Sequence, residues 1–270
     1  MHYYLLYIME ISITNLQKAE LFAGLFQHMK LFTENINISF EQERMFIQTM
    51  DASHISIVDI SIPVRWFDTY TLHDAALTIG INSTILTKVL STREKSQTIQ
   101  IKLNSEDTDT LQLGLSSGDK AIFDKDFEIP LLDLEQEVLA IPDTEPQAEF
   151  RLSSLHFSSI INQLKLFGQN MDIECSEEQI YLNSISTEHG KMRVSIDNGE
   201  LSEFSIDEGA KLKLSFSLNY LHHICAYNKL SKDVLIRLTE DFPLQVIYFL
   251  GGDEDATMRF FLAPKINDDL

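Results

Sequence analysis

The side chains that could do chemistry in this sequence form two small groups: His54 near Asp51 and Asp59, and His222-His223 near Cys225. The first group resembles a general acid and base pair, and the second offers imidazole and thiolate, which are common metal ligands. Neither group is accompanied by a Gly-rich phosphate loop, a paired CxxC or an HExxH motif. An enzyme is therefore an alternative that the spacing does not favour, and no cofactor and no metal ion are predicted.

The composition describes a globular but strongly acidic chain. In 270 residues, 41 Asp and Glu stand against 21 Lys and Arg, a formal charge of −20. Its 44% hydrophobic and 23% charged residues predict one large domain or two ordinary ones, with a sizeable core. Cys175 and Cys225 form no disulfide framework, which suits a reducing compartment.

No membrane segment is predicted, and the acidity argues at first against nucleic acid. The apolar run Tyr3–Met9 is too short for a signal peptide or a membrane span, and no other run approaches 18 apolar residues. Proteins that bind phosphate usually carry a basic surface.

The two halves of the chain match at an offset of 135 residues. Phe22–Asp51 then lies over Phe157–Ser186 without a gap, and apolar positions still coincide about 80 residues later. Shared periodicity alone would not keep one register across helices and strands. The identical pairs include Phe22/Phe157, Lys30/Lys165, Leu31/Leu166, Phe32/Phe167, Asn35/Asn170, Ile38/Ile173 and Glu43/Glu178.

Each half is predicted to be an α+β domain with the order β-α-β-β-β-α-β-β-β. Phe22, Leu25, Phe26 and Met29 mark one face of a helix, and Ser83–Ser91 predicts a second helix. Alternating segments predict antiparallel sheets, whose apolar face the helices would cover. In the first half the strand segments are Asn37–Phe40, Met45–Gln48, His54–Ile62, Thr98–Asn104 and Thr110–Leu115.

The acidic residues avoid the predicted helices. Four windows contain none of the 41 acids: Leu21–Phe32, Ile81–Arg93, His156–Asn170 and Phe216–Lys229. One interpretation is that short helices simply carry neutral polar residues. The other is that these helices face a negative partner, and a sparsely basic surface would hold a duplex loosely, without reading its sequence.

Six short segments carry a more specific pattern: Met50-Asp-Ala-Ser-His-Ile-Ser-Ile-Val58, Phe67-Asp-Thr-Tyr70, Leu132-Asp-Leu134, Ile141-Pro142, Asp241-Phe-Pro-Leu244 and Leu262-Ala-Pro-Lys-Ile266. Their combination closely resembles the proliferating cell nuclear antigen family, the sliding clamps of eukaryotic and archaeal DNA replication. The resemblance covers about residues 11–268.

This resemblance implies two similar domains per chain and a head-to-tail homotrimeric ring around duplex DNA. It implies no catalytic activity. The expected partners are a DNA polymerase, a clamp loader and replication and repair proteins with a short interacting peptide. The expected location is the nucleus, or a viral replication compartment if the source is a virus. The expected parts are an N-terminal extension (1–10), an N-terminal domain (11–117), an acidic connector (118–146) and a C-terminal domain (147–270).

Three sets of site residues are predicted, and the peptide pocket and the trimer joint follow from the resemblance. In the DNA-facing set, Lys30 and Lys88 match basic positions of the family, and the acid-free windows add Arg93, Lys165, His222, His223 and Lys229. The peptide pocket is Met50, His54, Ile55, Ile57, Leu139, Ile141, Pro142, Pro243, Phe261, Leu262, Ala263 and Pro264. The trimer joint pairs strands at about 125–131 and 191–196, with apolar contributions from Phe127, Ile129, Met192 and Val194.

The chain also departs from the family pattern. Pro130 removes one donor from the joint strand, and Phe261 stands where the family often has Tyr. Several positions that are usually basic carry Ala23, Gly24, Ser91, Ser159, Asn162 and Ala226, so lower DNA affinity is expected. A subunit of a checkpoint-type clamp, a clamp used in transcription and a scaffold that does not bind DNA remain alternatives.

Overall fold

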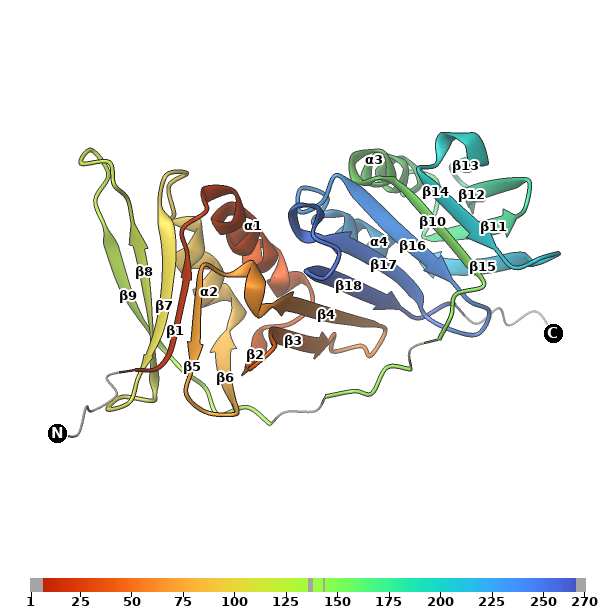
Figure 1. The fold of residues 1–270 in the computed structure, drawn as a ribbon. Helices are drawn as coiled ribbons and strands as arrows, with labels where there is room; N and C mark the ends of the chain where they lie inside the picture. The colour runs from red at the N-terminus through yellow and green to blue at the C-terminus, as the bar shows by residue number, and fades with distance from the viewer. Residues whose placement is uncertain (1–6, 136–137, 143, 266–270) are drawn as a thin grey trace. The chain divides into compact units, whose positions relative to one another are not determined.

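A computed structural model describes residues 7–135, 138–142 and 144–265. The chain forms two compact units (Figure 1). The first unit contains the described residues up to Thr49, together with Asp59–Leu139 and Asp253–Thr257. The second contains Met50–Val58, Ala140–Gly252 and the described residues from Met258 onward. Ile266, in the last predicted motif, lies outside the described residues.

The first half of the chain forms β1 (Tyr7–Ile13), α1 (Leu16–Gln27), η1 (Met29–Leu31), β2 (Asn35–Glu41), β3 (Arg44–Met50), β4 (Ser56–Pro63), η2 (Val64–Trp66), β5 (Thr69–Leu72), β6 (Ala76–Asn82), α2 (Ser83–Ser91), β7 (Thr98–Asn104), β8 (Thr110–Ser116) and β9 (Lys125–Pro130). Antiparallel strands lie in the orders β5-β1-β7-β8-β9 and β4-β3-β2-β6. Of the predicted extension 1–10, residues 1–6 lie outside the described part and Tyr7–Glu10 open β1.

The second half repeats this order with β10 (Ala148–Ser153), α3 (Ser154–Leu164), β11 (Asn170–Ser176), β12 (Gln179–Ser186), β13 (Gly190–Asp197), η3 (Asn198–Glu200), β14 (Glu203–Ile206), β15 (Lys211–Ser217), α4 (Leu218–Cys225), β16 (Asp233–Leu238), β17 (Leu244–Phe249), η4 (Leu250–Gly252) and β18 (Thr257–Leu262). Its strands lie in the orders β14-β10-β16-β17-β18 and β13-β12-β11-β15. Each strand therefore has a counterpart at the same place in the other half.

The α+β class is confirmed, and each half has two more strands between its helices than the sequence predicted. One of the additional strands is β5 in the first half and β14 in the second half. Each is four residues long and has no buried residue. Such a strand lacks the alternation of buried and exposed positions on which a prediction depends. It is held by pairing with its neighbour, for example Ile11 with Tyr70 and Phe150 with Phe204, and by a few side-chain contacts, such as the Tyr70 phenol donating to Glu41 O at 2.9 Å.

The cores are formed by the helix faces and the sheets that they cover. In the first unit Phe22, Leu25 and Phe26 of α1 are buried, and the rings of Phe22 and Phe26 meet edge to face at 5.3 Å. In the second, Phe157 and Ile161 of α3 occupy the equivalent buried positions. The apolar helix periodicity thus marks the buried face and leaves the opposite face of each helix free for function.

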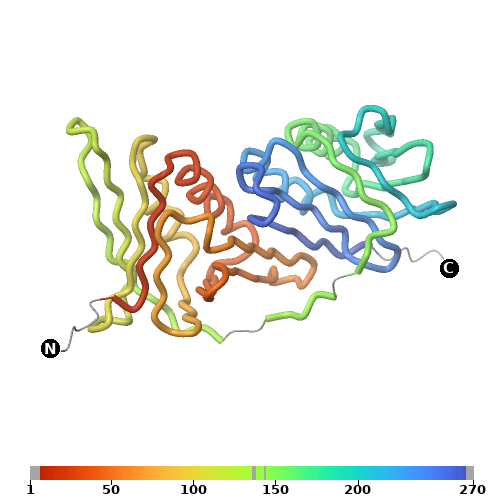
Figure 2. The backbone as a smooth tube through the Cα atoms, viewed as in Figure 1, coloured from red at the N-terminus to blue at the C-terminus, as the bar shows by residue number. Residues whose placement is uncertain are grey.

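The connector, whose path after β9 Figure 2 shows, contacts the first unit at Leu132, Glu135 and Leu139. Leu132 N–H donates to Gly80 O at 2.9 Å, and Asn37 Nδ2 donates to Glu135 O at 3.3 Å. The amide of Gln48 then binds both backbone groups of Leu139, at 2.7 and 3.2 Å. A Cβ at position 80 would lie 2.3 Å from Leu132 O, so this close approach requires glycine.

Candidate functional site

Two of the predicted DNA-facing residues of the first unit, Lys30 and Lys88, lie at the ends of two adjacent helices. Asn15 and Asn82 cap α1 and α2, since each side-chain oxygen accepts two backbone N–H groups of the first turn. Thr87 Oγ1 donates to Phe26 O at 2.6 Å and joins the two helices. Lys30 in η1 and Lys88 in the last turn of α2 are both exposed.

Arg93 has a structural environment. Its guanidinium donates to the backbone carbonyls of Gln97, Leu16 and Lys95 at 2.7, 3.1 and 3.1 Å. Burial lowers the pKa of Arg93, and the negative charge of Glu20 partly opposes this shift. The guanidinium is therefore occupied in joining the start of α1 to the turn after α2.

Glu20 is the one acidic residue within the four α-helices. The asparagine cap starts α1 at Leu16, five residues before the acid-free window begins, and so includes this exposed carboxyl. α2, α3 and α4 contain no Asp or Glu. The predicted scarcity of acids on the helices is confirmed in three of them and is incomplete in α1.

In the second unit, α3 and α4 are connected by polar side chains on their exposed sides. His222 Nδ1 lies 2.7 Å from Asn162 Oδ1, and Lys165 Nζ donates to Asn219 Oδ1 at 3.2 Å. Lys165 and Lys229 are exposed. This surface offers two ammonium groups and the His222 ring to a negative partner.

The pKa values of both adjacent histidines are lowered. For His222 the causes are burial and then the charge of Lys165. For His223 they are burial, His222 and Lys165. Both rings are therefore mostly neutral near pH 7 and gain charge only in more acidic solution.

Asp51 organises the loop between β3 and β4. Its carboxylate accepts backbone N–H groups from Ser53, Ile55 and Ser56 at 2.9, 2.8 and 2.5 Å. It also accepts the phenol of Tyr220, on α4, at 2.8 Å. Burial by itself would raise the pKa of Asp51, but these four hydrogen bonds outweigh it and lower the pKa below 3.8.

The predicted pocket residues that this loop carries are presented to solvent. His54 adopts a left-handed conformation (φ 58°), and both His54 and Ile55 are exposed. Ala263 N–H donates to Ile55 O at 2.9 Å, which brings the segment after β18 against the loop within the second unit. Met50, Ile57 and Pro264 are half-buried, and Pro243 is exposed.

Two of the predicted pocket residues are enclosed within their own unit. Phe261 is 5% exposed and Leu262 is fully buried, so both pack in the core and fix the backbone next to Ala263. The connector residues differ from them, since Leu139 and Ile141 are half-buried and Pro142 is exposed. Leu139 belongs to the first unit, and Ile141 and Pro142 belong to the second.

Sequence reasoning did not identify the roles of Gln48, Tyr220 and Asp51. The one signal is the position of Asp51 inside the Met50–Val58 motif, near His54, a pair that the sequence does not favour as a catalytic acid and base. The structure instead directs its carboxylate to backbone N–H groups and a phenol. The second group does not converge either, since Cys225 is buried with its pKa raised to about 12 by burial, while His222 faces Asn162.

The two strands predicted for a subunit joint are edge strands. Within the described residues, β9 pairs only with β8 and β13 pairs only with β12. Phe127, Met192 and Val194 are half-buried and available to a neighbour, whereas Ile129 is 1% exposed and packs inside its own unit. Pro130 ends β9, where its missing donor costs least.

Two other kinds of feature are absent from the described part of the chain. No helix there is long and apolar enough to span a membrane. No group of three or more His, Cys, Asp or Glu side chains in it is placed to hold a metal ion.

Comparison with known proteins identifies the family. The model of the N-terminal domain of proliferating cell nuclear antigen matches residues 11–138, and that of the C-terminal domain matches residues 140–266. The chain is 30% identical over 260 residues to proliferating cell nuclear antigen of Chaetomium thermophilum, covering 94% of this chain and 98% of that protein. It is 26% identical over 261 residues to proliferating cell nuclear antigen 2 of Plasmodium falciparum, covering 92% and 97%. Because the two domain models together span nearly the whole chain, it belongs to the proliferating cell nuclear antigen family of DNA sliding clamps.

Proposed function

We propose that three copies of the chain close into a head-to-tail ring that encircles duplex DNA and tethers a polymerase to it in the nucleus, or in a viral replication compartment. The observation that carries this proposal is that α1–α4 together contain a single acid in a chain of charge −20. A wall lined by these helices would not repel phosphate, and its few exposed lysines would let the ring slide.

The joint of the ring is proposed to form between β9 of one copy and β13 of the next. Both strands expose unpaired backbone groups at a sheet edge, and such edges readily accept another strand. Two different surfaces that meet head to tail close a ring when the rotation between copies fits. Three copies of a 30.9 kDa chain would have a mass of about 93 kDa.

The partner pocket is proposed to take a short peptide with an aliphatic residue followed, after two intervening residues, by two aromatics. Ile55, Ile57, Ile141 and Ala263 offer apolar surface that such anchors could desolvate. The peptide would come from the polymerase, from the clamp loader that opens the ring, or from replication and repair proteins. The loop that presents Ile55 is held in place by Asp51, so the pocket is organised before a partner arrives.

Connector variants test the pocket. Replacing Leu139 and Ile141 by Ala should weaken such a peptide at least roughly tenfold in calorimetry, since both anchors lose their partner surface. Val138→Ala is the matched control, because Val138 is 54% exposed on the same segment and is not assigned to the pocket. Unchanged affinity of the double variant would move the pocket elsewhere.

Primer extension on primed circular DNA tests the function as a whole. With a clamp loader and ATP, the protein should lengthen the products of a single polymerase binding event. Linear DNA with open ends is the control, because a sliding ring leaves it. Equal product lengths with and without the protein would refute the proposal, and a stable monomer or a mixed trimer would favour the scaffold or the checkpoint-type alternative.

A further inference from the structure

Phe123 is the most exposed large apolar side chain among the described residues, at 82%. It lies in the turn that leads into the edge strand β9. An isolated exposed aromatic ring is ordinary, but the backbone that carries this one is fixed by hydrogen bonds.

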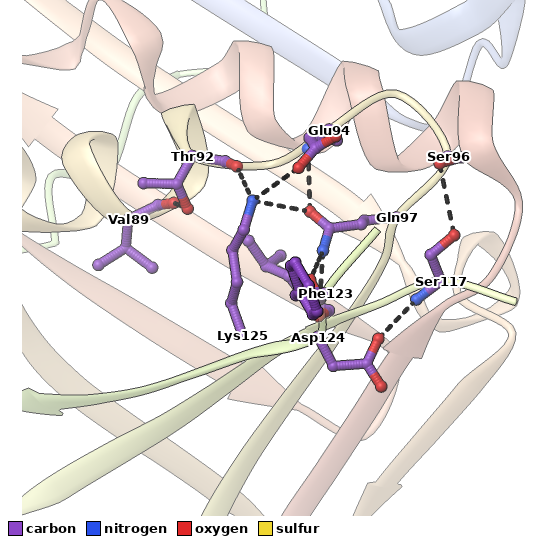
Figure 3. Close-up of polar contacts among 10 residues, drawn as sticks. Val89, Thr92, Glu94, Ser96, Gln97, Ser117, Phe123, Asp124 and Lys125 are labelled. Carbon is purple, nitrogen blue, oxygen red and sulfur yellow. Dashed lines mark hydrogen bonds and ion pairs between the residues drawn. The ribbon is translucent and has the colours of Figure 1, made fainter. Parts of the chain in front are cut away.

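The carbonyl of Phe123 and the side chains of the next two residues are held by hydrogen bonds (Figure 3). Phe123 O accepts from Nε2 of Gln97, which is completely buried, at 2.9 Å. Asp124 Oδ1 accepts from Ser117 N at 2.9 Å, and Lys125 Nζ donates to Thr92 O at 2.6 Å. The ring is therefore presented to solvent by a rigid support, which lowers the entropy cost of docking it.

A pocket that suits an aromatic ring lies beside the other edge strand. It measures about 450 Å³ and lies between the start of α3 and the end of β13 in the second unit. Leu152, Ile160, Val194, Ile196 and Leu201 provide its apolar lining.

The internal repeat indicates the direction in which β9 and β13 would pair. Their counterparts in the other half are β18 and β4. Ala263, just after β18, donates to Ile55, just before β4, so the end of β18 lies at the beginning of β4. This is an antiparallel arrangement. The same direction in a joint would bring the turn before β9, and with it Phe123, to the end of β13, where the pocket lies.

The exposed charges on the two strands are complementary. Asp126 and Glu128 are exposed on β9, and Lys191 and Arg193 are exposed on β13. The alternate residues Phe127, Met192 and Val194 are half-buried and lie on the face opposite these charges. Lys125 shares that face of β9, where its ammonium group donates to Thr92 O at 2.6 Å. Phe123 is four residues before Phe127, so strand periodicity would place both side chains on the same face. In the joint, that face would lie beside Val194.

We propose that Phe123 of one copy inserts into the pocket beside β13 of the next copy and anchors the joint of the ring. The inference rests on the proposed ring and adds to it an aromatic anchor outside the paired strands. A buried aromatic ring in a preformed pocket is the usual form of an interface hot spot. The occupant is a second copy of this chain. The side chain of Phe123 lies next to the edge strand β9 and the pocket lies next to the edge strand β13, and the joint would bring these two strands together.

Dilution experiments test the anchor. Mass photometry or sedimentation should find the Phe123→Ala variant dissociating at a concentration at least roughly tenfold higher than the native chain. Leu166→Ala is the control, since Leu166 is 70% exposed but does not line the pocket. Ser159→Trp, which fills the pocket from its rim, should weaken assembly in the same way. A native trimer with an unchanged Phe123→Ala variant would overturn the anchor alone, whereas a native chain that stays monomeric would overturn the ring.

Cross-linking tests the contact directly. Chains carrying Phe123→Cys and chains carrying Ser195→Cys are mixed and oxidised mildly. Because Cys175 and Cys225 are buried, the new thiols should react selectively. Disulfide-linked pairs of the two variants are expected only in the mixture. A mixture that forms trimers and no such pairs would refute the insertion.

Discussion

At the scale of single residues, one carboxylate supports the partner surface. Asp51 binds three backbone N–H groups within its own loop and the phenol of Tyr220, on α4. The loop carries His54 in a left-handed conformation that a non-glycine residue rarely adopts. The hydrogen bonds to Asp51 offset that strain and hold Ile55 outward, so the carboxylate acts through the loop and not on a partner directly.

Replacing Asp51 by Asn should lower the free energy of unfolding by about 2 kcal/mol, because a buried acceptor of four hydrogen bonds becomes partly a donor. Denaturant unfolding at pH 7 measures this, with Asp172→Asn, a half-buried carboxyl on β11, as the control. Since the pKa of Asp51 is lowered, its stabilisation is complete above pH 3.8 and is lost as the pH falls through the lower, folded value. An Asp51→Asn variant as stable as the control would contradict the role.

The pair His222 and His223 predicts a pH dependence of DNA binding. Both pKa values are lowered below 6.5, so the folded protein disfavours the charged rings. The free energy of unfolding therefore decreases as the pH falls below 6.5, where the unfolded chain binds these protons more readily. A nearby phosphate favours the charged form, so DNA affinity should rise between pH 7.5 and 5.5. Fluorescence anisotropy should find that rise reduced in the His222→Gln, His223→Gln variant, and an identical rise would remove the histidines from the DNA surface.

At the scale of elements, the connector depends on one glycine of β6. The carbonyl of Leu132 and the side chain of Leu134 occupy the space beside Gly80, and Leu132 N–H donates to Gly80 O. Gln48 then holds Leu139, at the beginning of the proposed pocket. The strands of the first unit thus determine where the connector begins its path.

The Gly80→Ala variant should release this segment, because the added Cβ would lie 2.3 Å from Leu132 O. The expected cost is about 1–3 kcal/mol in stability, with faster proteolysis in the connector and weaker peptide binding. Gly114→Ala on β8 is a matched control, since its nearest atom would lie at 3.4 Å. Equal proteolysis rates for the two variants would show that the connector is not held at this point.

At the scale of the whole molecule, the distribution of charge matters more than its total. A charge of −20 would repel DNA if it were spread evenly. The helices instead carry Lys18, Lys88 and one acid, and Lys30, Lys165 and Lys229 lie in the turns that follow them. A ring with this distribution would be acidic outside and mildly basic inside.

Replacing Lys30, Lys88 and Lys165 by Glu should reduce DNA-dependent stimulation of a polymerase at least roughly tenfold and leave the trimer intact, because about three phosphate contacts are lost. Lys95, Lys120 and Lys211 replaced by Glu form the control with the same total charge, since none of them belongs to the proposed DNA-facing set. Equal losses in the two variants would mean that only total charge matters.

Local periodicity in the sequence was enough to predict most elements and their repetition. The two joint strands, which are sheet edges, were implied by the family resemblance, whereas the apolar pattern itself predicted two equivalent halves and a helix at Ser83–Ser91 with those bounds. These features depend on residues a few positions apart, whose spacing the sequence states directly. The four-residue strands β5 and β14 were missed because they are held by their neighbours and not by their own pattern.

The tertiary structure alone decided which side chains meet over long distances in the chain. Asp51 and Tyr220 are 169 residues apart, and Gln48 and Leu139 are 91 apart, so no local pattern could pair them. The fold also buried Ile129, which the alternation of β9 could not distinguish from Phe127, and it occupied Arg93 with backbone carbonyls. The residue type determines which groups a side chain can bind. Only the packed chain determines which of those groups lies next to it, away from water.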